Sequence, residues 1–226
     1  MTDMKDCPPY LKEYIFYLRV IKNRSEKTIE SYYIDLRVFL RYIKENMMNA
    51  KGDDIDKIAD VPFSKVSAVT LADVYEYLNY SAEERGNNDK TRARKISAIK
   101  GFYKALCNNK LTSFHLEINP VETLDVPSPK KAQPKYLGLD ESRKLLENIS
   151  PAEDYYERDF CILMLFLNCG MRLSELVGIN IQDIDLDDRT LRLLGKGNKE
   201  RIVHINNGCE EAIRQYLAAR PDAPTD

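Results

Sequence analysis

The sequence predicts a mainly α-helical protein in two parts, a four-helix bundle and a partial α+β part with a small β-hairpin or sheet, joined by a proline-rich linker. Apolar residues recur every three or four positions through most of the first 107 residues, which is typical of amphipathic helices. Residues 119–135, NPVETLDVPSPKKAQPK, contain four prolines and no glycine, which favours an extended linker. Two short apolar runs flank a glycine-rich turn in LRLLGKGNKERIVHIN, which starts at residue 191. We therefore expect domains at residues 1–118 and 136–226.

The first two bundle helices follow recognisable start signals. One begins after Pro8 and Pro9, and the next after Ser25. Their apolar stripes would face the core: Tyr10, Leu11, Tyr14, Ile15, Leu18 and Ile21 in the first, and Ile29, Tyr32, Leu36, Phe39, Leu40 and Ile43 in the second.

The third and fourth helices complete the expected bundle. The third begins at Thr70, whose spacing to Asp73 fits a capping box, and stops near Gly86. The fourth spans roughly residues 90–107, with its apolar side inward and its basic residues on the other side.

After the linker, the pattern changes from helices alone to helices with a hairpin. We expect a helix from Asp140, a buried helix through DYYERDFCILMLFLNC that ends at Gly170, and a short helix in MRLSELVG. Strands are expected at about 189–194 and 201–205, and a last helix in EEAIRQYLAAR.

The net charge of −2 and the pI near 5.9 argue against a protein that is basic throughout. Residues 90–110 nevertheless hold seven lysines or arginines and no acid. Arg92, Lys95 and Lys100 share one broad helix face without carboxylates at i+3 or i+4, which would cost stability unless they serve another purpose. This face is either an ordinary solvated surface or a contact for DNA or RNA phosphates.

The longest apolar run, FCILMLFL at residues 160–167, is too short to span a bilayer, and the chain opens without a signal-peptide pattern. We therefore expect a cytoplasmic protein without a membrane partner. The five cysteines form no CxxC pair and are expected to be reduced, and neither a metal site nor a cofactor is predicted.

Two segments of the second part are candidates for chemistry. In CGMRLSELVG, Arg172 is either a surface arginine paired with Glu175 or an arginine placed to hold an anion. The hairpin turn is either a polar tip that protects an edge strand or a mobile arm that delivers the ammonium of Lys196, which lies between Gly195 and Gly197.

Several segments in this order resemble the tyrosine site-specific recombinases of the Xer and phage-integrase type. They are SEKTIESYYIDLRVFL, TRARKISAIKGFYKAL, the linker, GMRLSELVGI and LGKGNKERIVHI. The resemblance covers a SAM-like core-binding domain and the first half of a catalytic domain. It implies DNA strand cleavage and rejoining through a 3′-phosphotyrosyl intermediate. We expect the simpler Xer-like architecture, since the sequence shows no separate arm-DNA-binding segment ahead of the first bundle helix.

The resemblance also implies roles for individual residues. Arg172 would hold the scissile phosphate, Glu175 would orient Arg172, and Lys196 would be the general acid that protonates the leaving 5′ oxygen. Lys199 and Arg201 would seat the hairpin on phosphate. The DNA contacts of the bundle would come from its basic helix face, namely Arg92, Arg94, Lys95 and Lys100.

The sequence departs from the family after the hairpin. The family continues with a His-x-x-Arg segment, a second His or Trp and the nucleophilic tyrosine, but His115 and His204 fit neither position and Tyr216 falls in a structural helix. The chain is therefore predicted to be a truncated recombinase that binds DNA and is inactive alone. The full-length protein would act as a tetramer, a pair of dimers, on double-stranded DNA at a specific site.

A non-catalytic helical DNA-binding or protein-interaction module is the alternative. The reading frame beyond Asp226 distinguishes the two, because a His-x-x-Arg segment and a tyrosine there would support the enzyme. Whether the protein resolves chromosome dimers or moves a genetic element stays open.

Overall fold

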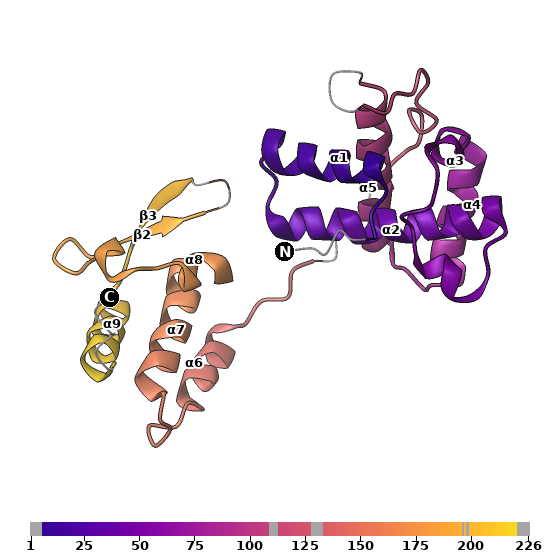
Figure 1. Ribbon diagram of the computed structural model, residues 1–226. Helices are drawn as coiled ribbons and strands as arrows, with labels where there is room; N and C mark the ends of the chain where they lie inside the picture. Colours follow the sequence, from indigo (N-terminus) through magenta and orange to yellow (C-terminus); the bar gives the residue numbers. More distant parts are fainter. Residues whose placement is uncertain (1–5, 109–112, 128–132, 196, 198, 221–226) are drawn as a thin grey trace. The chain divides into compact units, whose positions relative to one another are not determined.

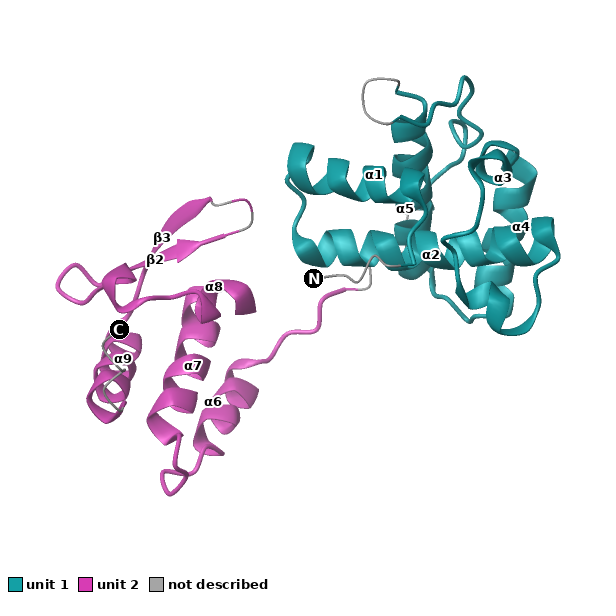
Figure 2. Ribbon diagram, viewed as in Figure 1, with its two compact units in different colours: residues 1–132 teal, residues 133–226 magenta. Residues whose placement is uncertain are grey.

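The computed structural model describes residues 6–108, 113–127, 133–195, 197 and 199–220. The chain divides into two compact units, residues 1–132 and residues 133–226, which are coloured separately in Figure 2. Each unit has its own cluster of buried apolar side chains. The predicted fold class, mainly helical with a small antiparallel sheet, is confirmed (Figure 1).

Unit 1 contains the four predicted bundle helices and two short additions. Its elements are α1 (Pro9–Phe16), the π-helical η1 (Tyr17–Ile21), α2 (Glu26–Met48), the 3-10 helix η2 (Gly52–Asp56), α3 (Phe63–Ser67), α4 (Leu71–Glu83) and α5 (Asp89–Leu106). The first predicted helix thus changes to a π-helix in its second half. The sequence analysis did not predict η2 and α3, which are too short to show a periodic apolar pattern.

Short polar side chains set the starts of the bundle helices. The hydroxyl of Ser25 accepts a hydrogen bond from the N–H of Thr28 at the start of α2. The predicted capping box of α4 is confirmed, because Thr70 and Asp73 each accept a hydrogen bond from the other's N–H. These caps satisfy donors that the first turn of a helix leaves unpaired.

Aromatic rings fill the core of unit 1. The ring of Tyr10 packs against those of Phe63, Phe102 and Phe114, with centroids 5.8 to 6.1 Å apart. Gly101 allows α5 to approach α1, since a Cβ at this position would lie 2.6 Å from the hydroxyl of Tyr14.

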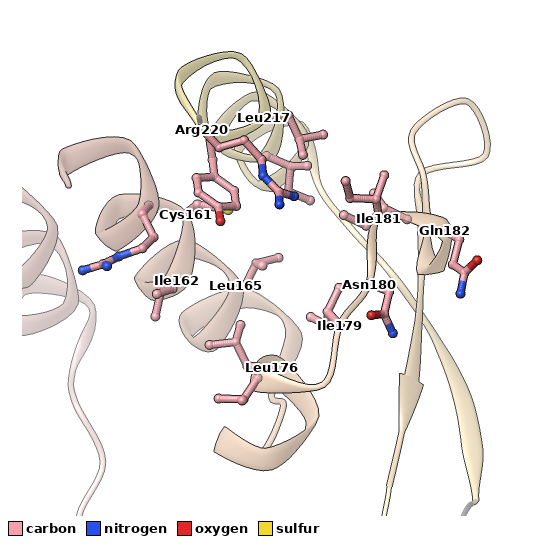
Figure 3. A pocket seen from close by; sticks show the side chains of 15 residues that line it. Cys161, Ile162, Leu165, Leu176, Ile179, Asn180, Ile181, Gln182, Leu217 and Arg220 are labelled. Atoms are coloured by element: carbon pink, nitrogen blue, oxygen red, sulfur yellow. The ribbon is translucent and has the colours of Figure 1, made fainter. Parts of the chain in front are cut away.

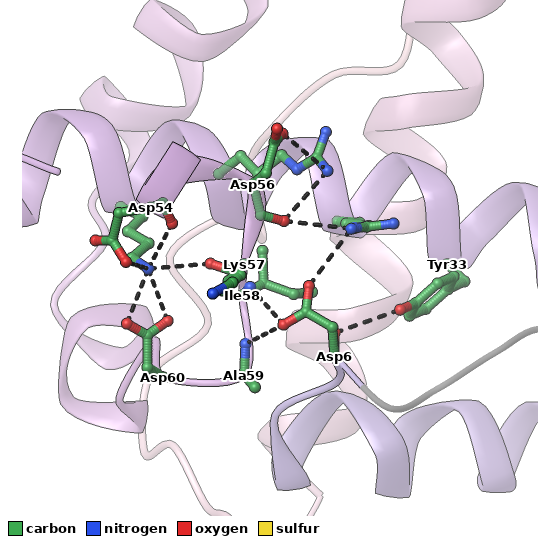
Figure 4. A network of polar contacts seen from close by, with 11 residues as sticks. Asp6, Tyr33, Asp54, Asp56, Lys57, Ile58, Ala59 and Asp60 are labelled. Atoms are coloured by element: carbon green, nitrogen blue, oxygen red, sulfur yellow. Dashed lines mark hydrogen bonds and ion pairs between the residues drawn. The ribbon is translucent and has the colours of Figure 1, made fainter. Parts of the chain in front are cut away.

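A polar network ties the acidic stretch after α2 to the bundle (Figure 4). The ammonium of Lys44, whose side chain is only 1% exposed, donates to the carboxylate of Asp60 at 2.8 Å and to the carbonyl of Asp54 at 2.7 Å. The carboxylate of Asp6 accepts a hydrogen bond from the N–H of Ile58 at 2.8 Å. These acidic residues therefore stabilise the fold of unit 1.

The start of the expected linker packs against unit 1. Val121 and Leu124 are buried in its core cluster, and the carbonyl oxygen of Leu124 accepts a hydrogen bond from the ammonium of Lys100. The two apolar side chains, three residues apart, bring this proline-containing segment onto the bundle. The packed part of the chain thus extends beyond the expected end at residue 118.

Unit 2 follows the predicted order of helices and strands. Its elements are α6 (Leu139–Glu147), α7 (Tyr156–Cys169), α8 (Leu173–Val177), the 3-10 helix η3 (Ile181–Asp183), β1 (Ile184–Asp185), β2 (Thr190–Leu194), β3 (Glu200–His204) and α9 (Asn207–Ala219). The strands form an antiparallel sheet in the order β1-β2-β3, in which Leu193 pairs with Arg201. The two-residue strand β1 was not predicted, because it lies in an acidic turn.

Helix α7 ends as predicted at Gly170, whose φ of +54° is in the left-handed region. The prediction that α7 is a buried helix is only partly correct. Cys161 and Leu165 are buried, whereas the other residues of its apolar run are half-buried. In the part of the chain that the structure describes, no helix combines the length and apolar character needed to cross a bilayer.

Candidate active site

Arg172 lies in the turn that connects α7 to α8. It is the N-cap residue of α8, and Glu175 lies in the first turn of that helix. Glu175 reaches back so that its Oε2 accepts a hydrogen bond from the N–H of Arg172 at 2.8 Å, while its Oε1 accepts one from Nη1 of Arg172 at 2.9 Å. The predicted proximity of these two residues is thus observed, and it arises from their i, i+3 spacing at a helix start.

The Glu175 carboxylate also binds Arg201 of β3. Nη2 of Arg201 donates to Oε2 of Glu175 at 2.9 Å and to the carbonyl oxygen of Gly170 at 3.3 Å. The hydrogen bond from Arg201, followed by that from the Arg172 N–H, lowers the pKa of Glu175 to about 2, although desolvation acts in the opposite direction. Glu175 is therefore a buried, ionised carboxylate shared by two arginines.

The two arginines differ in exposure. The side chain of Arg172 is 72% exposed and that of Arg201 41%, whereas that of Glu175 is 1% exposed. Arg172 therefore offers most of its guanidinium to solvent while one edge is fixed on a buried anion. An arginine held in this way suits a bidentate contact with a phosphate.

The hairpin between β2 and β3 closes directly beside this cluster. The N–H of Gly195 donates to the carbonyl of Lys199 at 2.8 Å, and Lys199 is exposed. A Cβ at Gly195 would lie 3.3 Å from Oε1 of Glu175, so the base of the hairpin packs against the shared carboxylate. The predicted general acid, Lys196, lies outside the described residues.

The basic side chains of α5 in unit 1 have partners within the protein, which the sequence did not suggest. Arg94 pairs with the carboxylate of Asp35 in α2, and Nζ of Lys95 lies 3.5 Å from the other oxygen of this carboxylate. Both acid and lysine are buried: Asp35 is 1% exposed and the Lys95 side chain 5%. Burial raises the pKa of Asp35 and lowers that of Lys95. The expectation that Lys95 lies on the solvent side of α5 is wrong, because it neutralises a carboxylate of the core.

The other two basic residues of this face also have partners. Arg92 pairs with Asp89, which is three residues earlier on α5. The ammonium of Lys100 donates to the carbonyl oxygens of Leu124 and Glu122. The expectation of an uncompensated face therefore needs correction, since the partners lie at i−3, on α2 and in the segment after α5.

Two models of one protein family match the chain in succession. The model described as "Phage integrase, N-terminal SAM-like domain" matches residues 11–110, and the model described as "Phage integrase family" matches residues 135–226. The chain belongs to the phage integrase family. The predicted resemblance is therefore confirmed.

The integrase chain is similar to curated relatives along most of its length. It is 40% identical over 218 residues to tyrosine recombinase XerC of Caldanaerobacter subterraneus subsp. tengcongensis, an alignment that covers 95% of this chain and 60% of the relative. It is 30% identical to tyrosine recombinase XerD of Halalkalibacterium halodurans, with 92% of this chain and 63% of the relative covered. The chain thus spans less than two thirds of the length of these relatives.

Solved structures share the fold of this integrase chain. XerH site-specific recombinase bound to a palindromic difH substrate matches with a TM-score of 0.67 and 19% identity, over 91% of this chain and 56% of that chain. The Tn1549 transposon integrase in complex with transposon right end DNA matches with a TM-score of 0.65 and 18% identity, over 95% of this chain and 66% of that chain.

The last tyrosine of the integrase chain, Tyr216, lies in α9, and its two histidines lie in β3 and in unit 1. Tyr216 of α9 lines an apolar groove of about 830 Å³, which also includes Ile162, Leu165 and Leu176 (Figure 3). His204 is the exposed last residue of β3, and His115 is exposed in unit 1. The interpretation that none of them takes the place of the family's His-x-x-Arg histidine or nucleophilic tyrosine stays a prediction.

Two contacts escaped the sequence analysis. Asp35 interrupts the apolar stripe of α2 between Tyr32 and Phe39, and a carboxylate at such a position signals a buried ion pair. The contact of Arg201 with Glu175 had no local signal, because the two residues are 26 positions apart. The described residues contain no group of three or more His, Cys, Asp and Glu side chains suited to a metal ion.

Proposed function

We propose that this chain is the DNA-binding part and the first catalytic part of a tyrosine recombinase, which cleaves and rejoins DNA strands through a 3′-phosphotyrosyl intermediate. The observation that carries the proposal is the exposed guanidinium of Arg172 fixed on the buried, ionised carboxylate of Glu175. Relatives named tyrosine recombinases XerC and XerD, and recombinases of the same fold solved with DNA, support it.

In this function, each residue of the site has a distinct role. A tyrosine oxygen from outside this chain attacks the scissile phosphorus, and the bond between phosphorus and the 5′ oxygen breaks. Arg172 stabilises the negative charge on the nonbridging oxygens, and Glu175 keeps Arg172 in place. Lys196 gives its proton to the departing 5′ oxygen. Lys199, exposed at the base of the hairpin, contacts the DNA backbone.

The full-length protein would bind double-stranded DNA at a specific recombination site and assemble there as a tetramer, a pair of dimers. The basic residues of α5 would contribute to this binding where their side chains can leave their present partners. Arg92 is the best candidate, because its partner Asp89 lies on the helix surface. Lys95 is the poorest, since it is buried.

The function is tested with a nicked suicide substrate, which traps a covalently bound strand. The chain 1–226 should bind the duplex but give no covalent product, whereas the longer protein that contains it should capture the strand. Arg172→Ala in the longer protein should reduce the rate of capture by about a hundredfold to a thousandfold and leave much of the binding.

Two results would contradict the proposal in different ways. A covalent product mapped to a tyrosine of residues 1–226 would show that the nucleophile has been overlooked. Binding by the longer protein without any strand capture would favour the non-catalytic DNA-binding module.

A further inference from the structure

Arg201 connects the hairpin to the turn that carries Arg172. Its Nη2 donates to the Glu175 carboxylate and to the carbonyl of Gly170, which ends α7. Both acceptors flank Arg172 in the sequence, two residues before it and three after it. One side chain from β3 therefore holds the two ends of the segment at whose centre Arg172 lies.

Arg172 depends on this support because little else restrains it. Its side chain is mostly exposed, and among the described residues its guanidinium has one side-chain partner, Glu175. A long, exposed side chain with a single contact retains much rotamer freedom unless that contact is itself fixed. The orientation of Arg172 therefore depends on how firmly Glu175 is held.

The restraints on Glu175 come from two directions. Two of its hydrogen bonds come from Arg172 itself, within the same helical turn. Among the described residues, a third comes from Arg201, and the backbone of Gly195 approaches Oε1 from the hairpin. Arg201 thus supplies a long-range hydrogen bond that fixes the carboxylate relative to the sheet.

The charges of the cluster fit this arrangement. Two guanidinium groups and one carboxylate leave one excess positive charge, so Glu175 can hold both arginines without cancelling the charge that a phosphate would meet. The Glu175 carboxylate is buried, whereas one edge of the Arg172 guanidinium is exposed. A phosphate that binds this exposed edge would therefore not contact the carboxylate directly.

We propose that Arg201 is a positioning residue, which orients Arg172 through the shared Glu175 carboxylate and holds the base of the hairpin against the same group. This inference rests on the proposed role of Arg172 at the scissile phosphate. It differs from the expectation that Arg201 seats the hairpin on DNA phosphate, because the guanidinium is bound to the turn between α7 and α8.

The first test needs no catalysis and uses the chain 1–226. Arg201→Gln is compared with Arg192→Gln, a matched control, because Arg192 is a similarly exposed arginine of the same hairpin that pairs with Asp183 and Glu200 instead. The side-chain Nε signal of Arg172 is followed by NMR relaxation, and its assignment is checked with Arg172→Lys. Arg201→Gln should increase the mobility of Arg172, and Arg192→Gln should leave it unchanged.

Unchanged mobility of Arg172 in a folded Arg201→Gln variant would overturn the proposal. Circular dichroism melting shows whether the variant is folded. If it is not, Arg201→Lys replaces it, because lysine keeps the charge but is shorter and lacks the forked guanidinium. The proposal then requires the same increase in Arg172 mobility, and unchanged mobility in this variant would overturn it equally.

The second test is a double-mutant cycle on strand cleavage in the longer protein. Arg201→Gln should slow cleavage about a hundredfold, the scale expected when a catalytic group is misplaced, and change DNA affinity little. In a Glu175→Gln background, Arg201→Gln should add almost nothing, since the proposed effect passes through Glu175. Arg192→Gln should leave the cleavage rate unchanged in both backgrounds.

A direct phosphate contact by Arg201 gives a different pattern. Arg201→Gln would then still slow cleavage in the Glu175→Gln background, and it would lower the log-log salt slope of DNA binding by about 0.9. That result would overturn the positioning role. If Arg172→Ala instead leaves cleavage unchanged, the proposed function of Arg172 fails, whereas the NMR comparison still decides whether Arg201 orients Arg172.

Discussion

Arg94 of α5 pairs with the buried carboxylate of Asp35 in α2, and the neighbouring Lys95 lies close to the same carboxylate. Two basic residues that the sequence assigned to a DNA-binding face thus join two helices of the bundle. Removing one member of a buried ion pair is costly, because the remaining charge loses its compensation in a poorly solvated place.

We therefore predict that Asp35→Asn destabilises the chain by about 3 kcal/mol, since it leaves the Lys95 ammonium buried without a counter-charge. Urea unfolding measures this change. Asp56→Asn is the control, because Asp56 pairs with Arg41 at the surface and such pairs contribute about 0 to 1 kcal/mol. An equal decrease in the free energy of unfolding in the two variants would mean that the ion pair of Asp35 is not effectively buried.

The same geometry predicts which basic residues of α5 contribute to DNA binding. Arg92→Gln should lower the log-log salt slope of duplex binding by about 0.9, because Arg92 can leave the surface partner Asp89 and contact a phosphate. Lys95→Met should leave the slope unchanged, since the ammonium is buried. Fluorescence anisotropy at several salt concentrations gives both slopes. A lower slope for Lys95→Met would show that this lysine leaves the core when DNA binds.

The sequence predicted features that are encoded locally. Thr70 and Asp73 form their capping box, and Gly170 ends α7, because each depends on residues within one helical turn. Arg172 and Glu175 meet for the same reason. Local spacing therefore sufficed for the helix ends and for the central pair of the candidate site.

Contacts between distant segments could not be predicted in this way. A search for carboxylates at i+3 and i+4 along α5 overlooks Asp35, which belongs to another helix. The search also gives no reason to connect Arg201 with Glu175, because that contact depends on how the β2–β3 hairpin packs beside α8. The charge count of the basic segment was correct, but the fold decides which of these charges meet solvent.

The shared carboxylate of Glu175 should make the stability of the fold depend on pH in the acidic range between about 4.5 and 2. The pKa of Glu175 is about 2 in the folded chain, below its ordinary value of 4.5. The ionised group therefore stabilises the fold fully above about pH 4.5, and this contribution is lost as the pH falls toward 2. Glu175→Gln cannot titrate, so its melting temperature should fall less steeply over this interval than that of the unmodified chain. An equally steep fall of the melting temperature with pH in both proteins would contradict the lowered pKa of Glu175.

Gly195 should be needed for the close approach of the hairpin to Glu175. A Cβ at this position would lie 3.3 Å from both Oε1 of Glu175 and the carbonyl oxygen of Lys199, so Gly195→Ala should destabilise the chain by about 1 kcal/mol. It should also shift the Nε NMR signals of Arg172 and Arg201. Gly138→Ala is the control in the same unit, where the nearest atom to an added Cβ is 3.5 Å away. Unchanged arginine signals in Gly195→Ala would show that the hairpin does not press on the carboxylate.

The proposed general acid can be tested in the longer protein by changing the leaving atom. If Lys196 protonates the departing 5′ oxygen, Lys196→Ala should slow cleavage by about two to four powers of ten. A bridging sulfur leaves with little need for a proton, so the variant should recover most of its rate on that substrate. Arg172→Ala should not recover, because charge on the nonbridging oxygens develops whichever atom leaves. Lys199→Ala is the control and should weaken binding without selective recovery. If the sulfur substrate instead restores the cleavage rate of Lys199→Ala and leaves Lys196→Ala slow, the general acid is not Lys196, the first lysine of the hairpin.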